Sequence, residues 1–476
     1  MPFKDVREFI DKLEKDGEAI RIEDEVDWNL EAGAMVRRSS EEDLPAPFFQ
    51  KVKGYPDGYR LFGAPGANYR RIAIAMDLKP ETHPRDIMKA YLEGKKEPLE
   101  PKIVKDGPCK ENVHTGDEVD LLEFPVPMIH ESDGGRYIGT WHLTVSKDLD
   151  SDWVNWGMYR HMLQNKNTVG ILLASESKHL WSMYSKGYQP RSKPMEVAIA
   201  IGTEPVSSLC AATYMKHGVS EGAIAGGIRR EPVEMIKCET VDLLVPATSE
   251  IVIEGSIKPG DTMVEGPFGE APGYMSGLQM PRPAIRVKAV THRNNPILTM
   301  SCMGIPVDDN CILAVTKGAE LLEILRARGL AVADVSIFPE GAYLVAAVSV
   351  KKTYAGVADD IAHTIWGTHI GPSIPYIIVV EDDVDPFNIK QVLHAIATKC
   401  HPYKSIYKLE RGPANNLIPW LSRYERTYEI GGRVYFDCTW PLDWDPKDVP
   451  KRISFAEAYP PKIQQKALDM WRKYGY

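Results

Sequence analysis

The sequence predicts a mixed α/β (α+β) protein of three domains, and three observations lead to this expectation. The chain has 476 residues, enough for two or three domains of ordinary size. Its middle part is rich in short apolar segments separated by turn residues, which is the pattern of a closed or partly closed β-barrel. In the last third, apolar strands alternate with helices, as expected for a largely buried sheet covered by helices.

The domain boundaries are placed where the composition changes. Residues 97–113 are rich in Pro, Lys and Gly and indicate a linker. The sequence pattern changes again after residue 305, from closely spaced strands to alternating strands and helices. We therefore expect domains at residues 1–114, 115–305 and 306–476.

Helical spacing marks several elements. Apolar residues recur every three or four positions over 3–16, 83–97 and 310–329, which predicts amphipathic helices there. Two helical insertions are expected inside the central domain, near 156–165 and 219–228. The chain closes with a further amphipathic helix.

Bulk properties exclude several classes of protein. The net charge is −9, with acidic and basic residues mixed, so a nucleic-acid scaffold is not expected. The seven cysteines form no CxxC pair, which argues against a disulfide framework or a structural zinc site. The charged amphipathic start has no signal-peptide core, and no apolar run is long enough to span a membrane. We expect a cytoplasmic enzyme.

Two carboxylates flank the turn "EGPFGE". Glycine and proline let the backbone bend sharply there, so Glu265 and Glu270 can face a common space. Like charges held close together raise the pKa of one acid, which then delivers a proton near neutral pH. Taken alone, the same residues also fit a surface turn with solvated acids.

Polar residues lie among aromatic ones in "DWVNWGMYRHM". Arg160 keeps its charge and can grip a carboxylate with two hydrogen bonds, either on a substrate or on a catalytic glutamate. Asn155, His179 and Glu221 together offer two oxygen ligands and one nitrogen ligand, which suits Mn²⁺ or Mg²⁺. Spacing by itself supports neither site, since each residue also fits a structural role.

Longer motifs resemble one family. The segments "DGGRYIGTWHLTVSKD", "NWGMYRHM", "AGGIRREPVE", "VPATSEIVIEG", "EGPFGEAPGY" and "IIVVEDDVD" occur in the order found in the UbiD family of reversible decarboxylases. The similarity covers nearly the whole chain. The block over residues 225–274 is its most specific part.

The resemblance implies a fold and a cofactor. The central domain would be a split-barrel-like flavin-binding domain holding prenylated FMN, which a separate flavin prenyltransferase supplies. A divalent ion, usually Mn²⁺, and K⁺ would lie at the flavin phosphate. Matched residue by residue, the metal ligands are Asn155, His179 and Glu221, and the cofactor-binding residues are Asn155, Met158, Tyr159, Arg160, Lys178, His179 and Glu221.

The family's catalytic network falls on Arg160, Glu265 and Glu270. The implied reaction is the reversible, non-oxidative loss of CO₂ from an aromatic, heteroaromatic or conjugated acid through a covalent adduct with the flavin. Glu270 would protonate the carbon that loses CO₂, while Arg160 positions Glu265. Decarboxylation at an sp² carbon needs such an electron sink, because the bare carbanion is unstable.

A hydroxybenzoate-type or related heteroaromatic acid is the expected substrate. Trp and Met side chains suit a flat apolar ligand, and the pocket candidates are Trp156, Met300, Met303, Ile305 and Pro306. The chain departs from the family pattern at Pro375, where several relatives place a lysine before the strand that leads to "EDDVD". The resemblance therefore implies no phosphate contact from the C-terminal domain.

Two rival functions remain open on the sequence. One is a metal-dependent hydrolase or lyase that uses Glu265 and Glu270 without flavin. The other is a non-catalytic flavin-binding assembly protein. For the decarboxylase, the resemblance implies a homodimer or a homohexamer in which the terminal helix is swapped onto a partner copy.

Overall fold

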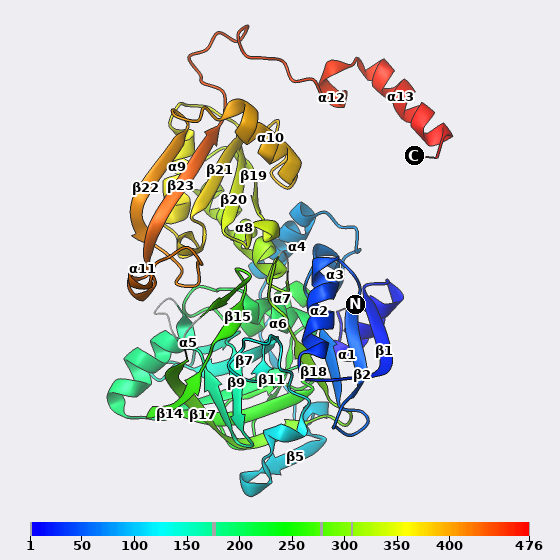
Figure 1. Cartoon of the computed structure of the whole chain (residues 1–476), viewed down its shortest axis with the longest axis vertical. Coiled ribbons are helices and arrows are strands. Elements are labelled where there is room, and N and C mark those ends of the chain that lie inside the picture. Colours follow the sequence, from blue (N-terminus) through cyan, green and yellow to red (C-terminus); the bar gives the residue numbers. More distant parts are fainter. Residues whose placement is uncertain (1, 174–177, 277–278, 306–307, 476) are drawn as a thin grey trace.

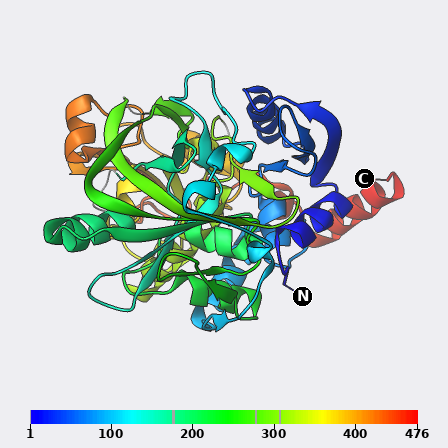
Figure 2. The ribbon, with the colours of Figure 1, turned by 90° about the horizontal axis from the view of Figure 1, so that it is seen from below.

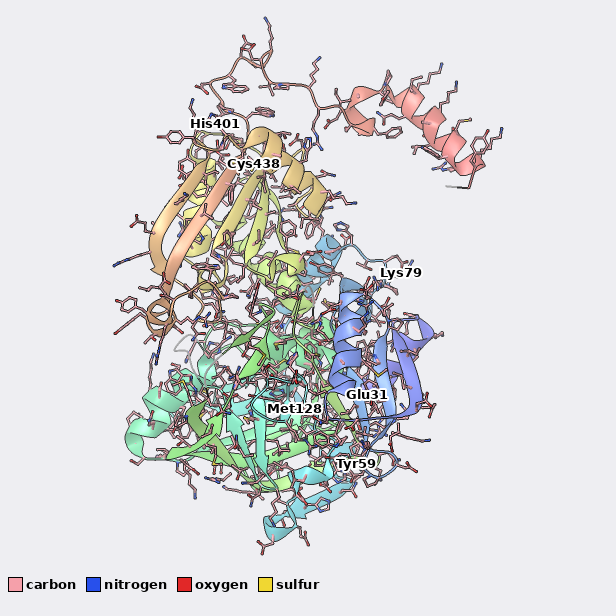
Figure 3. The ribbon with its side chains drawn as sticks, viewed as in Figure 1. Glu31, Tyr59, Lys79, Met128, His401 and Cys438 are labelled. Carbon is pink, nitrogen blue, oxygen red and sulfur yellow. The ribbon has the colours of Figure 1, made fainter. Side chains whose placement is uncertain are left out.

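The computed structural model describes residues 2–173, 178–276, 279–305 and 308–475. The chain forms a central barrel-like region, an N-terminal region beside it and a C-terminal region stacked at one end (Figure 1). A mixed α/β fold with a curled central sheet was predicted, and this is confirmed. Figure 3 places Tyr59 and Met128 in the lower half of the molecule and His401 and Cys438 at the opposite end.

The N-terminal region is a four-stranded sheet with helices against it. Its strands are β1 (Ala19–Val26), β2 (Ala46–Val52), β3 (Arg60–Gly63) and β18 (Ile297–Met300), in the order β1-β2-β3-β18. Its helices are α1 (Val6–Lys15), α2 (Glu31–Glu41), α3 (Tyr69–Ala75) and α4 (Pro84–Lys96). β18 comes from far along the chain, inside the range predicted for the central domain.

Helix α1 follows its predicted spacing. Asp5 accepts a hydrogen bond from the backbone N–H of Glu8, so the helix begins with a capped first turn. The buried face carries Val6, Phe9 and Ile10, which join the core shared with the C-terminal region. The helices predicted over 3–16, 83–97 and 310–329 are confirmed.

The central region is a nine-stranded sheet that curls into a half-barrel (Figure 2). The order is β6-β9-β10-β17-β14-β11-β7-β8, with β5 paired to β17. Its strands are β5 (Asn112–Thr115), β6 (Tyr137–Gly139), β7 (His142–Lys147), β8 (Val154–Gly157), β9 (His161–Asn165), β10 (Thr168–Ile171), β11 (Met195–Ile201), β14 (Ile251–Glu265) and β17 (Met280–His292). Register shifts in the β14–β17 pair help this long ribbon to bend.

Two small sheets flank the barrel. One contains β4 (Lys102–Ile103), β12 (Glu234–Lys237) and β13 (Leu244–Pro246), and the other is the hairpin of β15 (Phe268–Glu270) and β16 (Tyr274–Ser276). Short helical segments link the strands. They are the 3-10 turns η1 (Pro108–Lys110), η2 (Gly116–Glu118), η3 (Leu121–Glu123) and η5 (Gln189–Arg191), and the π-helix η4 (Met183–Tyr188).

The helix predicted near 156–165 is wrong. These residues form the end of β8 and the strand β9, which pair with β7 and with β10 and β6. Aromatic residues such as Trp156 fit a pleated surface well, and the sheet pairing decides the local conformation. The helix predicted near 219–228 is confirmed as α7 (Glu221–Arg229).

Helices α5 (His179–Ser182), α6 (Pro205–Ala212) and α7 lie beside the barrel. α7 packs closely on α4 because both carry glycine at the contact. A Cβ at Gly94 would lie 2.6 Å from the Cα of Ile228, and one at Gly227 would lie 2.3 Å from the carbonyl oxygen of Gly94. This close approach fixes α7, and with it Glu221 at its first turn.

The C-terminal region is a five-stranded sheet in the order β19-β20-β21-β23-β22. Its strands are β19 (Val332–Ile337), β20 (Val345–Val350), β21 (Tyr376–Glu381), β22 (Ile406–Pro413) and β23 (Ile430–Cys438). The helices are α8 (Cys311–Ala327), α9 (Val357–Trp366), α10 (Ile389–Lys399) and α11 (Arg423–Tyr428), with the short turns η6 (Pro339–Gly341) and η7 (Gly371–Ser373).

The tail leaves the body of the molecule. It holds α12 (Phe455–Ala458) and α13 (Pro461–Lys473), which stand apart from the rest (Figure 1). Neither helix buries a residue, and the apolar side chains of Ile463, Leu468 and Trp471 are exposed. Among the described residues, no helix combines the length and apolar character needed to cross a bilayer.

Candidate active site

Arg160 joins the two carboxylates of the "EGPFGE" turn. Its Nε donates to Glu265 Oε1 at 2.8 Å and its Nη2 donates to Glu265 Oε2 at 2.9 Å, so this pair is bidentate. Its Nη1 donates to Glu270 Oε1. Arg160 lies just before β9, while Glu265 ends β14 and Glu270 ends β15. Three distant segments therefore meet in one ion-pair network.

Burial makes this network sensitive to its proton content. The side chains of Arg160, Glu265 and Glu270 are 7%, 1% and 9% exposed. Burial opposes the charge of Arg160, but the ion pairs with Glu265 and Glu270 outweigh it and raise the pKa of Arg160. One guanidinium faces two carboxylates, so a proton on one of them brings the trio to neutrality.

Tyr137 is a fourth member that the sequence analysis did not single out. Its hydroxyl donates to Glu265 Oε1 at 2.9 Å, and its ring lies 4.2 Å from that of Phe268. Burial and the charge of Glu265 raise the pKa of Tyr137, so it remains a phenol and a hydrogen-bond donor. Tyr137 lies in the motif "DGGRYIG", but nothing in its sequence spacing separates it from the other residues of the barrel strands.

A histidine–aspartate pair holds the strand that carries Glu270. Asp133 accepts a hydrogen bond from the backbone N–H of Gly269 at 2.9 Å. His130 contacts Asp133 through Nδ1 at 3.1 Å and the carbonyl oxygen of Met303 through Nε2 at 3.0 Å. Burial lowers the pKa of His130, but its bonds to Asp133 and Cys302 overcome this and raise it to about 10. A charged His130 donates from both nitrogens and ties β15 to the segment after β18.

Asn155, His179 and Glu221 also come together. His179 Nδ1 donates to Asn155 Oδ1 at 2.9 Å, and Glu221 Oε2 accepts from the backbone N–H of Trp156 at 2.9 Å. Asn155 and Glu221 are each 1% exposed. Asn155 Nδ2 and His179 Nε2 are buried without a hydrogen-bond partner in the described part of the chain.

The electrostatics of this second cluster match those of a divalent-cation site. Burial and the neighbouring His217 lower the pKa of His179 to about 4, so its imidazole is neutral. Burial raises the pKa of Glu221 to about 8 despite two backbone hydrogen bonds. A carboxylate without a buried counter-ion is costly, and a divalent ion would supply that charge. The donor set fits the predicted Mn²⁺ or Mg²⁺.

The other residues predicted to bind the cofactor, Met158, Tyr159 and Lys178, lie in the chain between β8 and α5. The hydroxyl of Tyr159 accepts a hydrogen bond from the backbone N–H of Leu180 at 3.3 Å, which joins β8 to α5. Met158 is half-buried against the core shared by the N-terminal and C-terminal regions. Lys178 precedes α5 and is exposed.

A further cation comes from the C-terminal region. Lys317 on α8 is half-buried, and burial together with the charge of Lys178 lowers its pKa to about 8. Two ammonium groups that repel one another favour an anion between them. Pro375 lies at the start of β21, where its carbonyl oxygen accepts from the N–H of Val434. In the C-terminal region, a positive charge is therefore available from Lys317 on α8 and not from the position of Pro375 before β21.

The predicted substrate-side residues are in different environments. Trp156 is buried in the core with α6 and α7, and Met300 is buried in the barrel core. Met303 is half-buried beside that core, and Ile305 is exposed next to Gly273. Pro306 lies outside the described residues.

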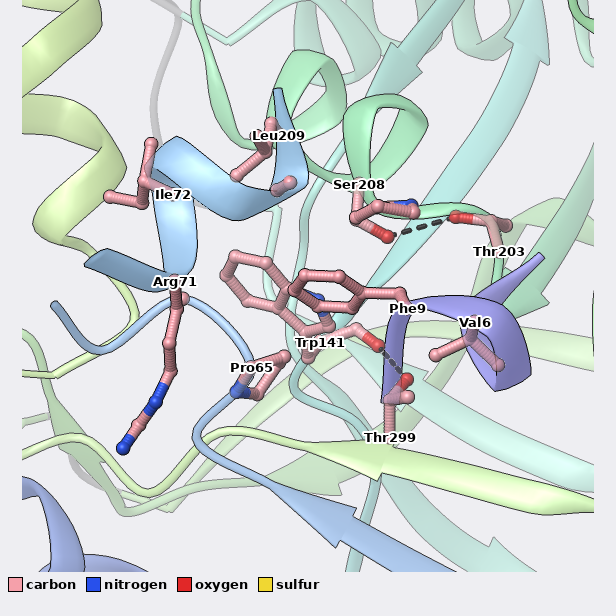
Figure 4. A pocket seen from close by; sticks show the side chains of 13 residues that line it. Val6, Phe9, Pro65, Arg71, Ile72, Trp141, Thr203, Ser208, Leu209 and Thr299 are labelled. Atoms are coloured by element: carbon pink, nitrogen blue, oxygen red, sulfur yellow. Dashed lines mark hydrogen bonds between the residues drawn. The ribbon is translucent and has the colours of Figure 1, made fainter. Parts of the chain in front are cut away.

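A small cavity lies elsewhere, between α1, α3 and α6 (Figure 4). Its volume is about 10 Å³, which is near the lower limit for one water molecule. Phe9, Pro65 and Trp141 form part of its wall, and Thr299 donates to the carbonyl oxygen of Trp141 at 2.7 Å. It is a packing void at the joint of two regions and cannot hold an aromatic acid.

Family models match almost the whole chain. The N-terminal, Rift-related and C-terminal domains of 3-octaprenyl-4-hydroxybenzoate carboxy-lyase match residues 10–91, 102–306 and 310–438. The chain belongs to the UbiD family. The predicted family membership is confirmed.

Two curated relatives of this UbiD-family chain are named as decarboxylases. The chain is 33% identical to pyrrole-2-carboxylic acid decarboxylase of Pseudomonas aeruginosa, over 99% of this chain and 98% of the relative. It is 31% identical to ferulic acid decarboxylase 1 of Saccharomyces cerevisiae, over 100% and 99% of the two chains.

Solved structures share the whole fold. The vanillic acid decarboxylase of Sedimentibacter hydroxybenzoicus in its closed form is 29% identical, with a TM-score of 0.88 over 100% of both chains. The UbiD-class enzyme HmfF of Pelotomaculum thermopropionicum, solved with FMN, is 29% identical, with a TM-score of 0.84 over 98% of this chain and 99% of that one. An evolved dimeric form of HmfF was solved with prFMN.

Proposed function

We propose that this chain catalyses the reversible, non-oxidative decarboxylation of an aromatic, heteroaromatic or conjugated carboxylic acid with prenylated FMN. The observation that carries the proposal is the buried network in which Arg160 bridges Glu265 and Glu270. The cluster of Asn155, His179 and Glu221, with its unsatisfied polar atoms, supports a bound cofactor–metal unit.

The cofactor would be held by residues of two regions. Asn155, His179 and Glu221 would bind Mn²⁺ (or Mg²⁺), and K⁺ would be the second cation of the cofactor site. Lys178 and Lys317 would add positive charge for the phosphate. Met158 and Tyr159 would line the flavin. When bound, prenylated FMN supplies the electron sink that decarboxylation at an sp² carbon requires.

The residues of the chain handle the proton and the carboxylate. Glu270 is the more exposed of the two acids, and we assign it as the proton donor to the carbon that loses CO₂. Arg160 keeps Glu270 and Glu265 in place and attracts the substrate carboxylate. Tyr137 helps to hold Glu265 in place by donating a hydrogen bond to its Oε1.

The substrate proposal is a planar acid of the hydroxybenzoate or heteroaromatic kind. The relatives named for pyrrole-2-carboxylic, ferulic and vanillic acids all act on planar conjugated acids, which supports this class. Met303 and Ile305 offer soft apolar contacts near β15.

Co-expression with a flavin prenyltransferase tests the function. Purified protein should carry a modified flavin and release CO₂ from at least one acid of a panel spanning hydroxybenzoates, pyrrole carboxylates and cinnamates. It should also exchange deuterium into the product at the carbon that bore the carboxylate. Full activity of a colourless, metal-loaded protein would favour the flavin-free hydrolase or lyase. Bound prenylated flavin without turnover or exchange on any acid would favour an assembly protein.

We also propose a cytoplasmic homodimer or homohexamer with α13 swapped onto a partner copy. The exposed apolar side chains of Ile463, Leu468 and Trp471 support this, because such a stripe is normally buried. Deleting residues 462–476, or changing Leu468 and Trp471 to Ala, should lower the mass measured by light scattering. Lys466→Ala on the same helix is the control. An unchanged mass in both variants, or a monomeric wild type, would contradict the proposal.

A further inference from the structure

A second group of metal-type ligands lies away from the proposed active site. His114 is on β5, Glu123 is in η3 and His292 ends β17. One ligand atom from each lies within 4.8 Å of the other two. In Figure 1, β5 is at the bottom of the molecule, whereas β15 lies higher, facing the C-terminal region.

Strand pairing explains why the two histidines meet. β5 runs antiparallel to β17, with His114 opposite Val290 and Asn112 opposite His292. His114 and His292 are therefore diagonal neighbours on one face of the sheet. Their rings are stacked, with centroids 5.5 Å apart and planes 10° apart. η3 then brings Glu123 over the same face.

His292 carries a buried, unused lone pair. The residue is 4% exposed, and its Nδ1 donates to the carbonyl oxygen of Arg293 at 2.8 Å. This bond assigns the proton to Nδ1 and leaves Nε2 as an acceptor. Within the described ranges Nε2 has no hydrogen-bond partner and is shielded from solvent. A buried polar atom without a partner is costly, so this arrangement needs a ligand or another explanation.

The surroundings favour a cation over a simple stacked pair. Two more carboxylates add negative charge. Asp120 lies close enough to interact electrostatically with Glu123, and Glu111 with His292. The rings of Phe124 and Tyr59 lie 5.4 Å and 6.2 Å from that of His292 and give the site an apolar wall. Stacking uses the ring faces only and leaves Nε2 of His292 unsatisfied.

We propose that His114, Glu123 and His292 bind one Zn²⁺ ion, with water as a fourth ligand. Two imidazoles and a carboxylate form a donor set typical of zinc. Tetrahedral zinc holds such atoms about 3.4 Å apart, so the longest separation must shorten. The half-buried side chains of His114 and Glu123 can rotate to achieve this. The ion would tie β5 and η3 to the end of β17.

Zinc titration of the flavin-loaded protein tests the proposal, because the metal at the cofactor is then already in place. Loosely bound metal is first removed with a chelator, and ZnCl₂ is then added at micromolar concentration. Wild type should then bind about one more Zn²⁺ per chain than His114→Ala or Glu123→Gln. His401→Ala removes an exposed histidine at the opposite end of the molecule and should behave as wild type (Figure 3). Zinc should also raise the melting temperature of wild type and of His401→Ala, but not of the two ligand variants.

Cobalt gives a spectroscopic readout that does not depend on activity. Co²⁺ in place of Zn²⁺ should produce visible absorption bands of a four-coordinate ion in wild type, and these bands should be lost in His114→Ala. The zinc of this site should also persist in flavin-free Glu221→Ala, since that residue belongs to the other cluster. Equal zinc content in wild type, His114→Ala and Glu123→Gln would overturn the proposal. Occupancy reached only at millimolar zinc would overturn it as well.

Discussion

The two clusters of the proposed active site differ in how completely their polar groups are paired. In the Arg160 network, both oxygens of Glu265 accept hydrogen bonds, and Tyr137 adds a third donor. In the Asn155 cluster, Nδ2 of Asn155 and Nε2 of His179 have no partner in the described part of the chain. Glu265 is thus satisfied by groups of the chain itself, whereas none of the three side chains of the second cluster carries a positive charge.

The difference separates two tasks. A group that transfers a proton must already be oriented when substrate arrives, so its partners are built into the fold. A group that binds a metal must keep a lone pair free, as Nε2 of His179 does, so it remains unsatisfied until the ion is present. The stability cost of such an open site is offset when the ion binds. The four predictions that follow probe one cluster or the other.

The largest effect is expected at Glu270. Glu270→Gln should keep metal and flavin but lose turnover by about 10²–10⁴-fold, because a positioned proton donor contributes that much. Deuterium exchange into the product, followed by NMR with the flavin confirmed by its spectrum, is the measurement. Glu131→Gln changes an exposed acid next to His130 and should leave the rate unaltered. Exchange at the wild-type rate in Glu270→Gln would place the proton donor elsewhere.

Removing the carboxylate of Glu221 from the Asn155 cluster should prevent the cofactor from binding. Glu221→Ala should lose both Mn²⁺ and flavin, since the remaining Asn155 and His179 are neutral ligands. Metal analysis and absorption spectroscopy of the purified variant measure both losses. Glu231→Ala, just beyond the same helix, is the matched control. If Glu221→Ala retained both groups, the metal assignment would fail.

In the metal-free protein, the Asn155 cluster should lower the free energy of unfolding at high pH. Burial raises the pKa of Glu221 from the ordinary value of 4.5 to about 8, so the folded state binds the proton more tightly than the unfolded state. The stabilising contribution of the protonated form is complete below pH 4.5 and is lost as pH rises through 8. Glu221→Gln should therefore stabilise the metal-free protein by about 2 kcal/mol above pH 8.

Thermal melting from pH 5 to pH 9 checks this expectation. The gap between Glu221→Gln and wild type should widen as pH rises, and added Mn²⁺ should reverse it by stabilising wild type alone. Glu231→Gln, an exposed acid, should follow wild type throughout. A constant gap at every pH would mean that Glu221 ionises without penalty.

The smallest effect is expected at Tyr137, in the fully paired network. Tyr137→Phe removes one hydrogen bond to Glu265, worth about 1 kcal/mol, so kcat should fall roughly 5-fold with little change in KM. Bound flavin and metal content should stay at the wild-type level, because Tyr137 contacts neither Asn155, His179 nor Glu221. Tyr403→Phe, at an exposed position, is the control. A lower rate that comes with a higher KM or with loss of bound flavin would indicate a structural role only.

Much of the fold could be predicted because the responsible signals are local. The helix that became α8 follows from apolar periodicity, and the barrel strands follow from alternation between turns. The segment near 156–165 was mistaken for a helix, because its strand conformation depends on pairing with β7 and β10. The predicted domain boundaries stay a prediction, although β18 reaches across to the N-terminal sheet.

The candidate site was predictable only in part. Glu265, Glu270 and Arg160 lie in dense motifs whose residue types already suggest acid chemistry. Tyr137, Lys317 and the pair of His130 and Asp133 gave no such signal, because a single polar residue in a strand or helix has many uses. His114, Glu123 and His292 were missed for the same reason, since no ligand spacing links them along the chain.

The sequence by itself determined the family, the mixed α/β class and the chemical types present, because composition, periodicity and long ordered motifs are properties of the chain alone. Only the tertiary structure decided which groups are paired and which are left open. Hydrogen-bond satisfaction, burial and the resulting pKa values depend on neighbours that lie as far apart in the chain as Tyr137 and Glu265, or Lys178 and Lys317. Those neighbours exist only once the sheets and helices have packed.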